Sequence, residues 1–285
     1  MSEISRVGIV GCGLMGSGIA EVCARAGLDV IVADITAEAT AAGQRRVEES
    51  MNRARERGKL AAEEHERALA NLRFTQDLDE FADREVTIEA VTEDEELKTG
   101  IFARLDKAVQ SPDAILASNT SSIPIMKLGM ATSRPEHVIG IHFFNPVPVQ
   151  ALVEVVPSLL TGDPVTDAAA RFASETLGKT VIRAKDRAGF VVNALLVPYL
   201  LSAVRMLESG FASAEDIDRG MVLGCAHPMG PLRLTDLIGL DTTRSIAESL
   251  FEEFKEPLFS PPPLLLRMVE AGLLGRKSGR GFYQY

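Results

Sequence analysis

The chain has 285 residues, and at about 150 residues for a typical domain this length predicts two domains. Apolar residues make up 46% and charged residues 25%, a globular composition that excludes disordered and collagen-like chains. The net charge of −10 argues against nonspecific binding to nucleic acid or an anionic membrane, because such binding needs excess Lys and Arg. A ligand that carries phosphate must therefore occupy a local site.

The cysteines point to a reducing compartment. Cys12, Cys23 and Cys225 are an odd number and have no CxxC spacing, so we expect neither a disulfide framework nor a metal site. The first residues lack a basic segment followed by a long apolar one, so no signal peptide is expected. The most apolar stretch, residues 189–204, is too short for a membrane span, which needs about 20 apolar residues. These features predict a cytoplasmic protein with no membrane partner.

The first 186 residues alternate short β-branched apolar runs with segments of helical period, which predicts βα units in a doubly wound, mainly parallel sheet. Residues 37–72 are rich in Ala, Arg and Glu, and they predict a helical hairpin insertion that is longer than a crossover requires. The predicted strands are residues 7–10, 30–33, 86–90, 115–117, 138–141, 152–156 and 181–183.

Residues 187–285 show no strand alternation and predict a second, all-helical domain, with the boundary near Asp186. Gly and Pro residues separate segments that have apolar residues at helical spacing. The predicted helices are residues 193–209, 213–223, 240–254 and 262–271.

A dinucleotide-binding motif opens the first domain. A strand is followed by Gly11-x-Gly13-x-x-Gly16, then by a helix and a second strand. In a Rossmann-type fold the first glycine permits the tight turn, the second lets the backbone approach a pyrophosphate, and the third lets helix and strand pack closely. The helix begins at Leu14 and Met15, where backbone N–H groups and the helix dipole favour phosphate. We expect these five residues to contact the cofactor.

The nucleotide is predicted to be NAD. Asp34 ends the second strand 18 residues after Gly16, where a carboxylate accepts hydrogen bonds from ribose hydroxyls and repels a 2′-phosphate. No Arg or Lys follows until Arg45, so NADP lacks a partner for its additional charge.

An alcohol oxidised by NAD needs a base for its proton, and His is the natural candidate. Of the four histidines, His142 ends a predicted strand and precedes a turn, which is the edge where α/β sheets bind ligands. Glu154 lies within a later predicted strand, and a carboxylate among apolar neighbours is costly unless it is paired. We expect Glu154 to pair with His142 and fix its tautomer, the alternative being an exposed glutamate on an edge strand.

Two further polar features admit two interpretations each. Residues 118–122 (SNTSS) follow a predicted strand, where they cap a helix or hydrogen-bond a substrate oxygen or the cofactor amide. Asn193 stands in an apolar run, where a buried amide needs partners that are helix caps or a substrate.

Over nearly its whole length the chain resembles the short-chain L-3-hydroxyacyl-CoA dehydrogenases, in particular the bacterial 3-hydroxybutyryl-CoA dehydrogenases. The segments that carry the resemblance are residues 10–16 (VGCGLMG), 118–122 (SNTSS), 142–148 (HFFNPVP), 152–154 (LVE), 189–193 (GFVVN), 228–231 (PMGP) and 277–283 (KSGRGFY).

The resemblance implies reversible oxidation of an (S)-3-hydroxyacyl-CoA, with the four-carbon substrate expected, in fatty acid or butanoate metabolism. It implies His142 as the catalytic base, Glu154 as its partner, and Ser121 and Asn193 as residues that hold the substrate oxygen and the site's geometry. It also implies that the second domain contributes to substrate binding and forms a homodimer. The further cofactor contacts that it implies are Glu93, Lys98, Ser121, Asn145 and Lys277.

The hairpin is implied to cover the CoA moiety, with contacts from Ser50, Arg57, Lys59 and Ser121. Relatives often present a Lys where this chain has Arg57, which is a departure from the family's pattern. Residues 45–59 contain six basic and three acidic side chains, a local charge of +3 that suits phosphates. Without the resemblance, a solvated helix with pairs such as Glu49–Arg53 would explain these charges.

Two other functions stay open. The first is a dehydrogenase of a free hydroxy acid, of the L-gulonate or 3-hydroxyisobutyrate type, and the basic hairpin argues against it. The second is a non-catalytic NAD-binding protein, against which the predicted His142–Glu154 pair argues. The sequence does not set the acyl chain length, the physiological direction or the oligomeric state.

Overall fold

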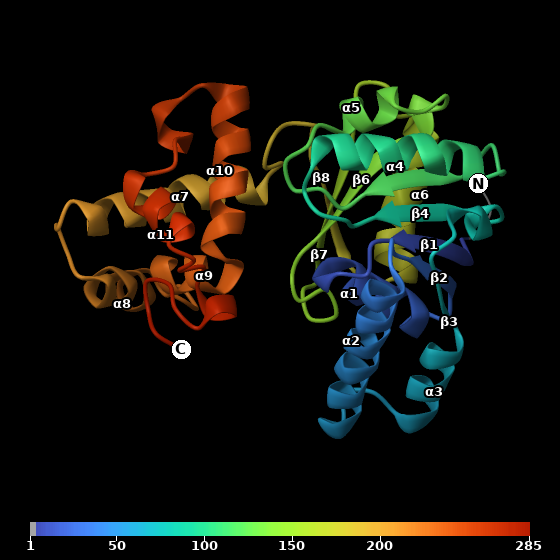
Figure 1. The fold of residues 1–285 in the computed structure, drawn as a ribbon, viewed down its shortest axis with the longest axis horizontal. Coiled ribbons are helices and arrows are strands. Elements are labelled where there is room, and N and C mark those ends of the chain that lie inside the picture. The colour runs from blue at the N-terminus through green and yellow to red at the C-terminus, as the bar shows by residue number, and fades with distance from the viewer. Residues whose placement is uncertain (1–3) are drawn as a thin grey trace. The chain divides into compact units, whose positions relative to one another are not determined.

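The computed structural model describes residues 4–285, which divide into two compact units, one ending at Asp186 and the other running from Arg187 to Tyr285 (Figure 1). The first unit contains β1 (Arg6–Val10), α1 (Leu14–Arg25), β2 (Asp29–Ala33), α2 (Ala37–Glu56), α3 (Ala62–Ala70), β3 (Leu72–Thr75), η1 (Leu78–Phe81), β4 (Val86–Glu89), α4 (Glu95–Ala108), β5 (Ile115–Ser118), α5 (Ile125–Met130), η2 (Pro135–His137), β6 (Val138–Phe143), β7 (Leu152–Pro157), α6 (Asp163–Arg171), η3 (Phe172–Thr176) and β8 (Thr180–Arg183).

The strands of the first unit form one sheet in the order β3-β2-β1-β4-β5-β6-β7-β8. All neighbours are parallel except β6 and β7, which are antiparallel. The order of the strands reverses direction between β1 and β4. In such sheets ligands bind at this switch point, outside the carboxyl ends of the strands. The predicted Rossmann-type, mainly parallel sheet is confirmed.

Helices cover both faces of the sheet, and alternate residues of each strand show which face they meet. On β6, Ile139 and Ile141 join the core formed with α1 and α6. Between them Gly140 faces Ile125 of α5 on the other side, where a Cβ would lie 3.0 Å from its Cδ1. The face covered by α4 and α5 therefore receives residues 140 and 142 of this strand.

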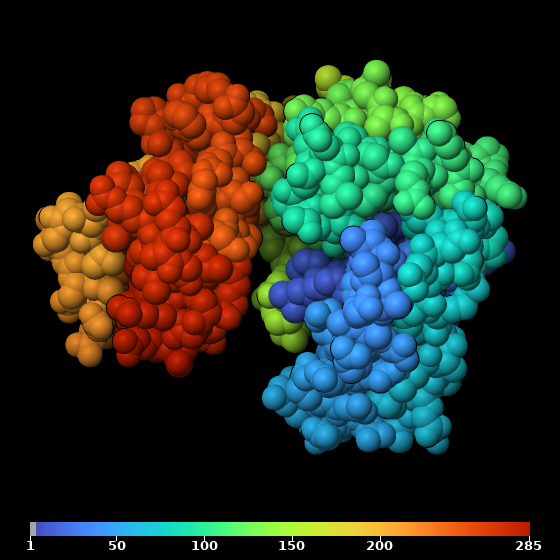
Figure 2. Space-filling view, in the orientation of Figure 1, coloured from blue at the N-terminus to red at the C-terminus, as the bar shows by residue number. Residues whose placement is uncertain are grey.

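The helical hairpin is formed by α2 and α3, which project away from the sheet (Figure 1). The Thr36 hydroxyl caps α2 by accepting from the Ala39 amide at 3.1 Å, and Gly58 takes a positive φ of 66° after the helix ends. Val47 and Met51 are buried in the core that the hairpin shares with α1. Figure 2 shows the outer face of the hairpin at the surface of the first unit.

The second unit is all-helical, as predicted. It contains α7 (Val192–Glu208), α8 (Ala214–Cys225), α9 (Pro231–Ile238), α10 (Leu240–Phe254), η4 (Pro257–Phe259), α11 (Pro263–Glu270) and η5 (Arg276–Ser278). Among the helices of residues 4–285, none combines the length and the apolar character that crossing a membrane requires.

Three elements differ from the sequence prediction. No strand is predicted at β3, because its sequence LRFT lacks the β-branched apolar run that identifies the other strands; in the structure it pairs only with β2 at the sheet edge. No helix is predicted at α9, because Pro228 and Pro231 indicate a helix stop, whereas Pro231 occupies the first helical turn, which Pro favours. The strand β6 continues past Ile141 to Phe143, because its antiparallel ladder with β7 extends that far.

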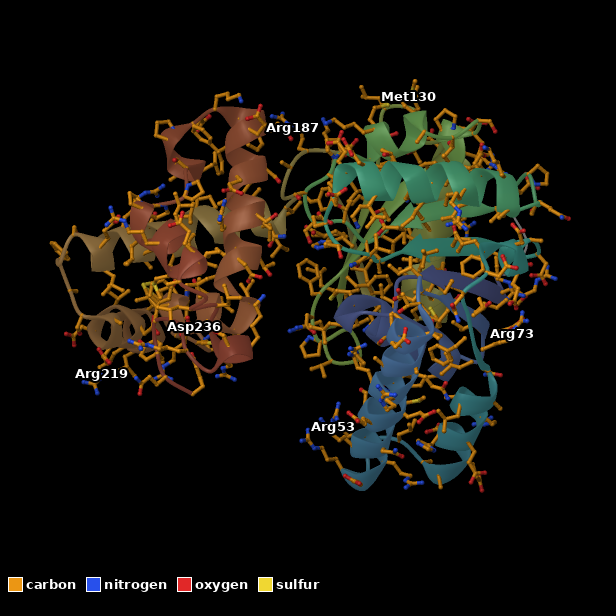
Figure 3. All side chains as sticks on the ribbon, viewed as in Figure 1. Arg53, Arg73, Met130, Arg187, Arg219 and Asp236 are labelled. Atoms are coloured by element: carbon orange, nitrogen blue, oxygen red, sulfur yellow. The ribbon has the colours of Figure 1, made fainter. Side chains whose placement is uncertain are left out.

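Asp236 organises the carboxyl-terminal segment of the second unit (Figure 3). It is 1% exposed, and its two carboxylate oxygens accept the backbone amides of Phe282 and Tyr283, each at 2.9 Å. A Cβ at Gly281 would lie 2.0 Å from Asp236 Oδ1, so only glycine fits there. The segment 277–283 therefore has a structural role in holding the end of the chain on α9.

Replacing Asp236 by Ala should destabilise the protein, because it leaves two partly buried amides without their acceptor, at about 1–3 kcal/mol each. We expect the free energy of unfolding to fall by about 3 kcal/mol, measured by urea denaturation followed by circular dichroism. The fully exposed Glu252 provides the control, since Glu252→Ala should leave the free energy of unfolding nearly unchanged. Equal stability of the Asp236→Ala variant and the wild type would contradict the assignment.

Candidate functional site

The turn after β1 leaves room for a phosphate. Gly11 has a positive φ of 90°, and a Cβ at Gly16 would lie 1.8 Å from the Gly11 carbonyl oxygen. A Cβ at Gly13 would meet nothing within 4 Å, so open space lies in front of this residue. Gly13 is also the N-cap of α1 and brings no side-chain hydrogen bond to it, which leaves the first N–H groups of the helix for a ligand.

Asp34 lies at the end of β2 with its carboxylate oriented by two backbone amides. Oδ2 accepts from the Cys12 N–H at 2.8 Å, and Oδ1 accepts from the Ile35 N–H at 2.7 Å. A cavity of about 720 Å³ lies beside this carboxylate, lined by Gly13, Asp34, Ile35 and residues of α4 such as Leu97 and Ile101. The open turn, the helix terminus and the oriented carboxylate together fit a dinucleotide.

His142 and Glu154 face each other across β6 and β7. They are directly opposite in the antiparallel register, so both side chains lie on the same face of the sheet. His142 Nδ1 lies 2.7 Å from Glu154 Oε2, with the His142 residue 3% exposed and Glu154 fully buried. Because β7 has β8 as its other neighbour, Glu154 is on an inner strand, and the alternative of an exposed edge-strand glutamate is wrong.

Ser121 lies at the other nitrogen of the imidazole. Its Oγ is 3.0 Å from His142 Nε2, while its backbone amide donates to Glu93 Oε1 at 2.9 Å. When Nδ1–H donates to the carboxylate of Glu154, Nε2 is left with a lone pair that the Ser121 hydroxyl or a substrate hydroxyl can meet. The structure thus brings together three residues that the sequence predicted from separate segments.

Glu93 holds the loop that carries Ser121. Besides the Ser121 amide, its Oε1 accepts from the Thr120 hydroxyl at 2.5 Å and the Ser122 amide at 3.1 Å. Burial favours a raised pKa of Glu93, but Lys98 and these hydrogen bonds outweigh it and hold the pKa below its usual value. Glu93 is therefore ionised at neutral pH and acts as an acceptor.

Lys98 lies behind Glu93. Its side chain is 1% exposed, with Nζ 2.7 Å from Glu89 Oε1 and 3.3 Å from Glu93 Oε2. Carboxylates cover its ammonium group, so we expect Lys98 to act on a cofactor through Glu93 and not by direct contact. Asn145 lies two residues after the end of β6 and is exposed.

Sequence reasoning did not single out Glu89 or a structural role for Asn119. Glu89 ends β4 fully buried, and the signal that identified Glu154, a carboxylate in an apolar strand, was present here too. Asn119 Oδ1 accepts the Phe143 amide at 2.8 Å, which fixes the loop after β5 to the end of β6. No local pattern reveals that bond, because its partners are 24 residues apart.

Asn193 and Lys277 belong to the second unit. Asn193 is in the first turn of α7 and is 9% exposed, which is consistent with the predicted buried amide. Lys277 Nζ pairs with the Asp241 carboxylate at 2.5 Å, with about half of its side chain exposed. The roles of both residues stay predictions.

Three of the four residues expected at CoA lie along the hairpin. Ser50 is half-buried on α2, while Arg57 and Lys59 are exposed at the tip. In Figure 3 Arg53 points outward from α2, and its contact with Glu49 is long at 3.8 Å and solvent-exposed, so the pair contributes little. Arg53, Arg57 and Lys59 therefore present their charges to solvent, whereas the half-buried Arg46 donates from Nη1 to the Cys12 carbonyl at 2.7 Å.

The cysteines give a direct test of the turn's packing. Burial and the hydrogen bond to Asp34 raise the pKa of the Cys12 thiol to about 12, and burial raises that of Cys23 to about 12, whereas Cys225 is exposed. Because the thiolate is the reactive form, we expect iodoacetamide at about pH 8 to modify Cys225 alone in the native protein and all three cysteines in urea. Peptide mapping that finds Cys12 modified in the native protein would contradict this packing.

Comparison with known proteins extends these observations. Residues 6–187 match the model of the 3-hydroxyacyl-CoA dehydrogenase NAD binding domain, and residues 189–285 match that of the C-terminal domain. A 3-hydroxybutyryl-CoA dehydrogenase from Mycobacterium tuberculosis is 60% identical over 282 residues, 99% of each chain.

Two solved structures are similar throughout. FadB2 of M. tuberculosis has a TM-score of 0.99 at 60% identity, with all of both chains covered. The (S)-3-hydroxybutyryl-CoA dehydrogenase PaaH1 from Ralstonia eutropha has a TM-score of 0.93 at 46% identity, with 99% of both chains covered. The chain belongs to the 3-hydroxyacyl-CoA dehydrogenase family, whose members are NAD-binding oxidoreductases.

Proposed function

We propose that this protein catalyses the reversible oxidation of an (S)-3-hydroxyacyl-CoA to the 3-ketoacyl-CoA with NAD, and that 3-hydroxybutyryl-CoA is its substrate. The observation that carries the proposal is the Ser121–His142–Glu154 arrangement at the carboxyl ends of β5 and β6, with distances of 3.0 and 2.7 Å. The four-carbon substrate is supported by the similar proteins from M. tuberculosis and R. eutropha, both of which are named 3-hydroxybutyryl-CoA dehydrogenases.

His142 acts as the base in the direction of oxidation. Its Nε2 takes the proton of the substrate's 3-hydroxyl while the C3 hydride leaves, so that the C–O bond becomes a carbonyl. The nicotinamide, when bound, accepts that hydride. Glu154 holds the Nδ1–H tautomer and favours the imidazolium that forms, and the Ser121 hydroxyl is placed to hold the substrate oxygen.

For the cofactor we assign the phosphates to the turn of Gly11, Gly13, Leu14, Met15 and Gly16. We assign the ribose hydroxyls to Asp34 and further contacts to Glu93, Ser121, Asn145 and Lys277, with Lys98 acting through Glu93. The preference for NAD over NADP rests on Asp34, whose carboxylate faces the cavity and repels a 2′-phosphate.

For the CoA moiety we assign Ser50, Arg57 and Lys59 on the hairpin, together with Ser121 at the thioester end. Arg57 replaces the expected Lys without loss of charge, and its guanidinium can bind phosphate with two donors. Asn193 is assigned to the site from the second unit.

The second unit is proposed to form a homodimer. Its described surface exposes the large apolar side chains Leu195, Phe211 and Leu223, each more than 70% exposed, which a partner subunit would remove from water. We place the protein in the cytoplasm, a proposal supported by its three free cysteines.

Replacing His142 by Ala should lower turnover of acetoacetyl-CoA by about 10² to 10⁴, because the proton donor and acceptor is lost. NADH binding, measured by fluorescence titration, should stay unchanged, since His142 lies outside the turn that holds the phosphates. Activity close to that of the wild type would sink the assignment of the base. Tight NADH binding by the wild type without turnover of any acyl-CoA would instead favour a non-catalytic protein.

Replacing both Arg57 and Lys59 by Ala should raise KM for acetoacetyl-CoA with little change in kcat, because their charges bind the nucleotide end of CoA far from the reacting carbon. For acetoacetyl-N-acetylcysteamine, a thioester without phosphates, KM should not change. The exposed Arg171 on α6 provides a control, since Arg171→Ala should alter neither KM. An equal rise in KM for both thioesters would refute the hairpin's role, and activity on free acetoacetate alone would overturn the CoA assignment.

A further inference from the structure

Glu89 is a buried carboxylate at the carboxyl end of β4. Val86 and Ile88 of this strand join the core with α1, so Glu89 faces the other side of the sheet, where α4 packs. It is 0% exposed, yet it is not one of the residues that bind, abstract or donate anything in the proposed reaction. Its side chain lies on the same face of the sheet as that of His142.

The Glu89 carboxylate accepts three hydrogen bonds, two of which lead to the site. Oε1 accepts from Lys98 Nζ at 2.7 Å and from the Val91 amide at 2.7 Å. Oε2 accepts from the Ser118 hydroxyl at 2.6 Å. Glu89 and Ser118 are register partners on β4 and β5, so the sheet itself sets this bond.

Two routes of hydrogen bonds and ion pairs connect Glu89 to the segment 118–122. The direct route passes through Ser118, whose Oγ also accepts the Thr120 amide at 3.1 Å. The second passes through Lys98, which lies 3.3 Å from Glu93, and Glu93 accepts the Ser121 amide at 2.9 Å. Both routes end on the loop that sets the Ser121 hydroxyl 3.0 Å from His142 Nε2.

Stability alone does not explain this cluster. Glu89 and Lys98 are almost fully buried while the Glu93 side chain is 30% exposed, and a buried ion pair is on average no more stable than well-packed apolar side chains. Hydrogen-bonded charges do, however, fix direction and distance in a way that apolar packing does not. A site that must hold a hydroxyl within a fraction of an ångström needs such support.

We infer that Glu89 is a positioning residue for the reaction, acting through Ser118 and through the Lys98–Glu93 pair to hold Ser121 against His142. The inference rests on the proposed function and adds to it a residue that touches neither substrate nor cofactor.

The variant Glu89→Gln tests the inference with little change of shape. An amide offers one acceptor oxygen where the carboxylate offers two, so either Lys98 or Ser118 loses its acceptor, and one negative charge is removed beside Lys98. We expect kcat for acetoacetyl-CoA at saturating NADH to fall about 10- to 100-fold, as for a displacement of the catalytic groups by up to about 1 Å.

A double-mutant cycle with Ser121→Ala separates positioning from a general loss of stability. If Glu89 acts through Ser121, Glu89→Gln should have little further effect on kcat in the Ser121→Ala background. Glu21 offers a matched control, since it is also buried, at 1% exposed, and lies 3.3 Å from a cation, Arg25 Nη1. Glu21→Gln should leave kcat unchanged in both backgrounds.

A second readout does not depend on turnover. The ring signals of His142 in the NMR spectrum, assigned by their loss in His142→Ala, should shift in Glu89→Gln and not in Glu21→Gln. Wild-type kcat in Glu89→Gln, additive effects in the cycle, or unshifted His142 signals would each overturn the inference. If Glu89→Gln does not fold, the same double-mutant cycle is measured with Ser118→Ala in its place. If the wild-type protein itself does not turn over acetoacetyl-CoA, the proposed function is refuted instead.

Discussion

The pairing of His142 with Glu154 is the constraint on which the site depends. A carboxylate without solvent must be paired, and the antiparallel register of β6 and β7 sets the imidazole directly opposite it. This is also the one antiparallel pairing in the sheet of the described chain. Because the two residues lie in one ladder, their distance of 2.7 Å is set by backbone hydrogen bonds instead of by a flexible loop.

The same face of the sheet also holds the buried pair of Glu89 and Lys98. Glu89 and Ser118 end neighbouring strands there, and α4 brings Lys98 over them. The Rossmann topology explains the coincidence, since the carboxyl ends of its parallel strands share one edge. The dinucleotide turn after β1 opens at that edge as well, so cofactor and catalytic groups are organised by one sheet.

Much of this could be predicted from the sequence. The glycine spacing, Asp34, and the carboxylate in an apolar strand each have a local signature, and each residue lies where its pattern indicates. The strand β3 was missed because it has no β-branched apolar run, and the helix α9 was missed because Pro at its start is also typical of a helix stop. The links from Glu93 to the 118–122 loop escaped for another reason, since they join residues about 28 positions apart and leave no period in the sequence.

The most direct test of the central pairing is the turnover of Glu154→Gln with acetoacetyl-CoA and NADH. The amide keeps the shape and can still accept the Nδ1–H bond, but it cannot stabilise the imidazolium. We predict a fall in kcat of about 10² to 10⁴ with unchanged NADH affinity. A kcat within about twofold of the wild type would contradict the account, because loss of even one pKa unit of stabilisation of the imidazolium corresponds to a tenfold change.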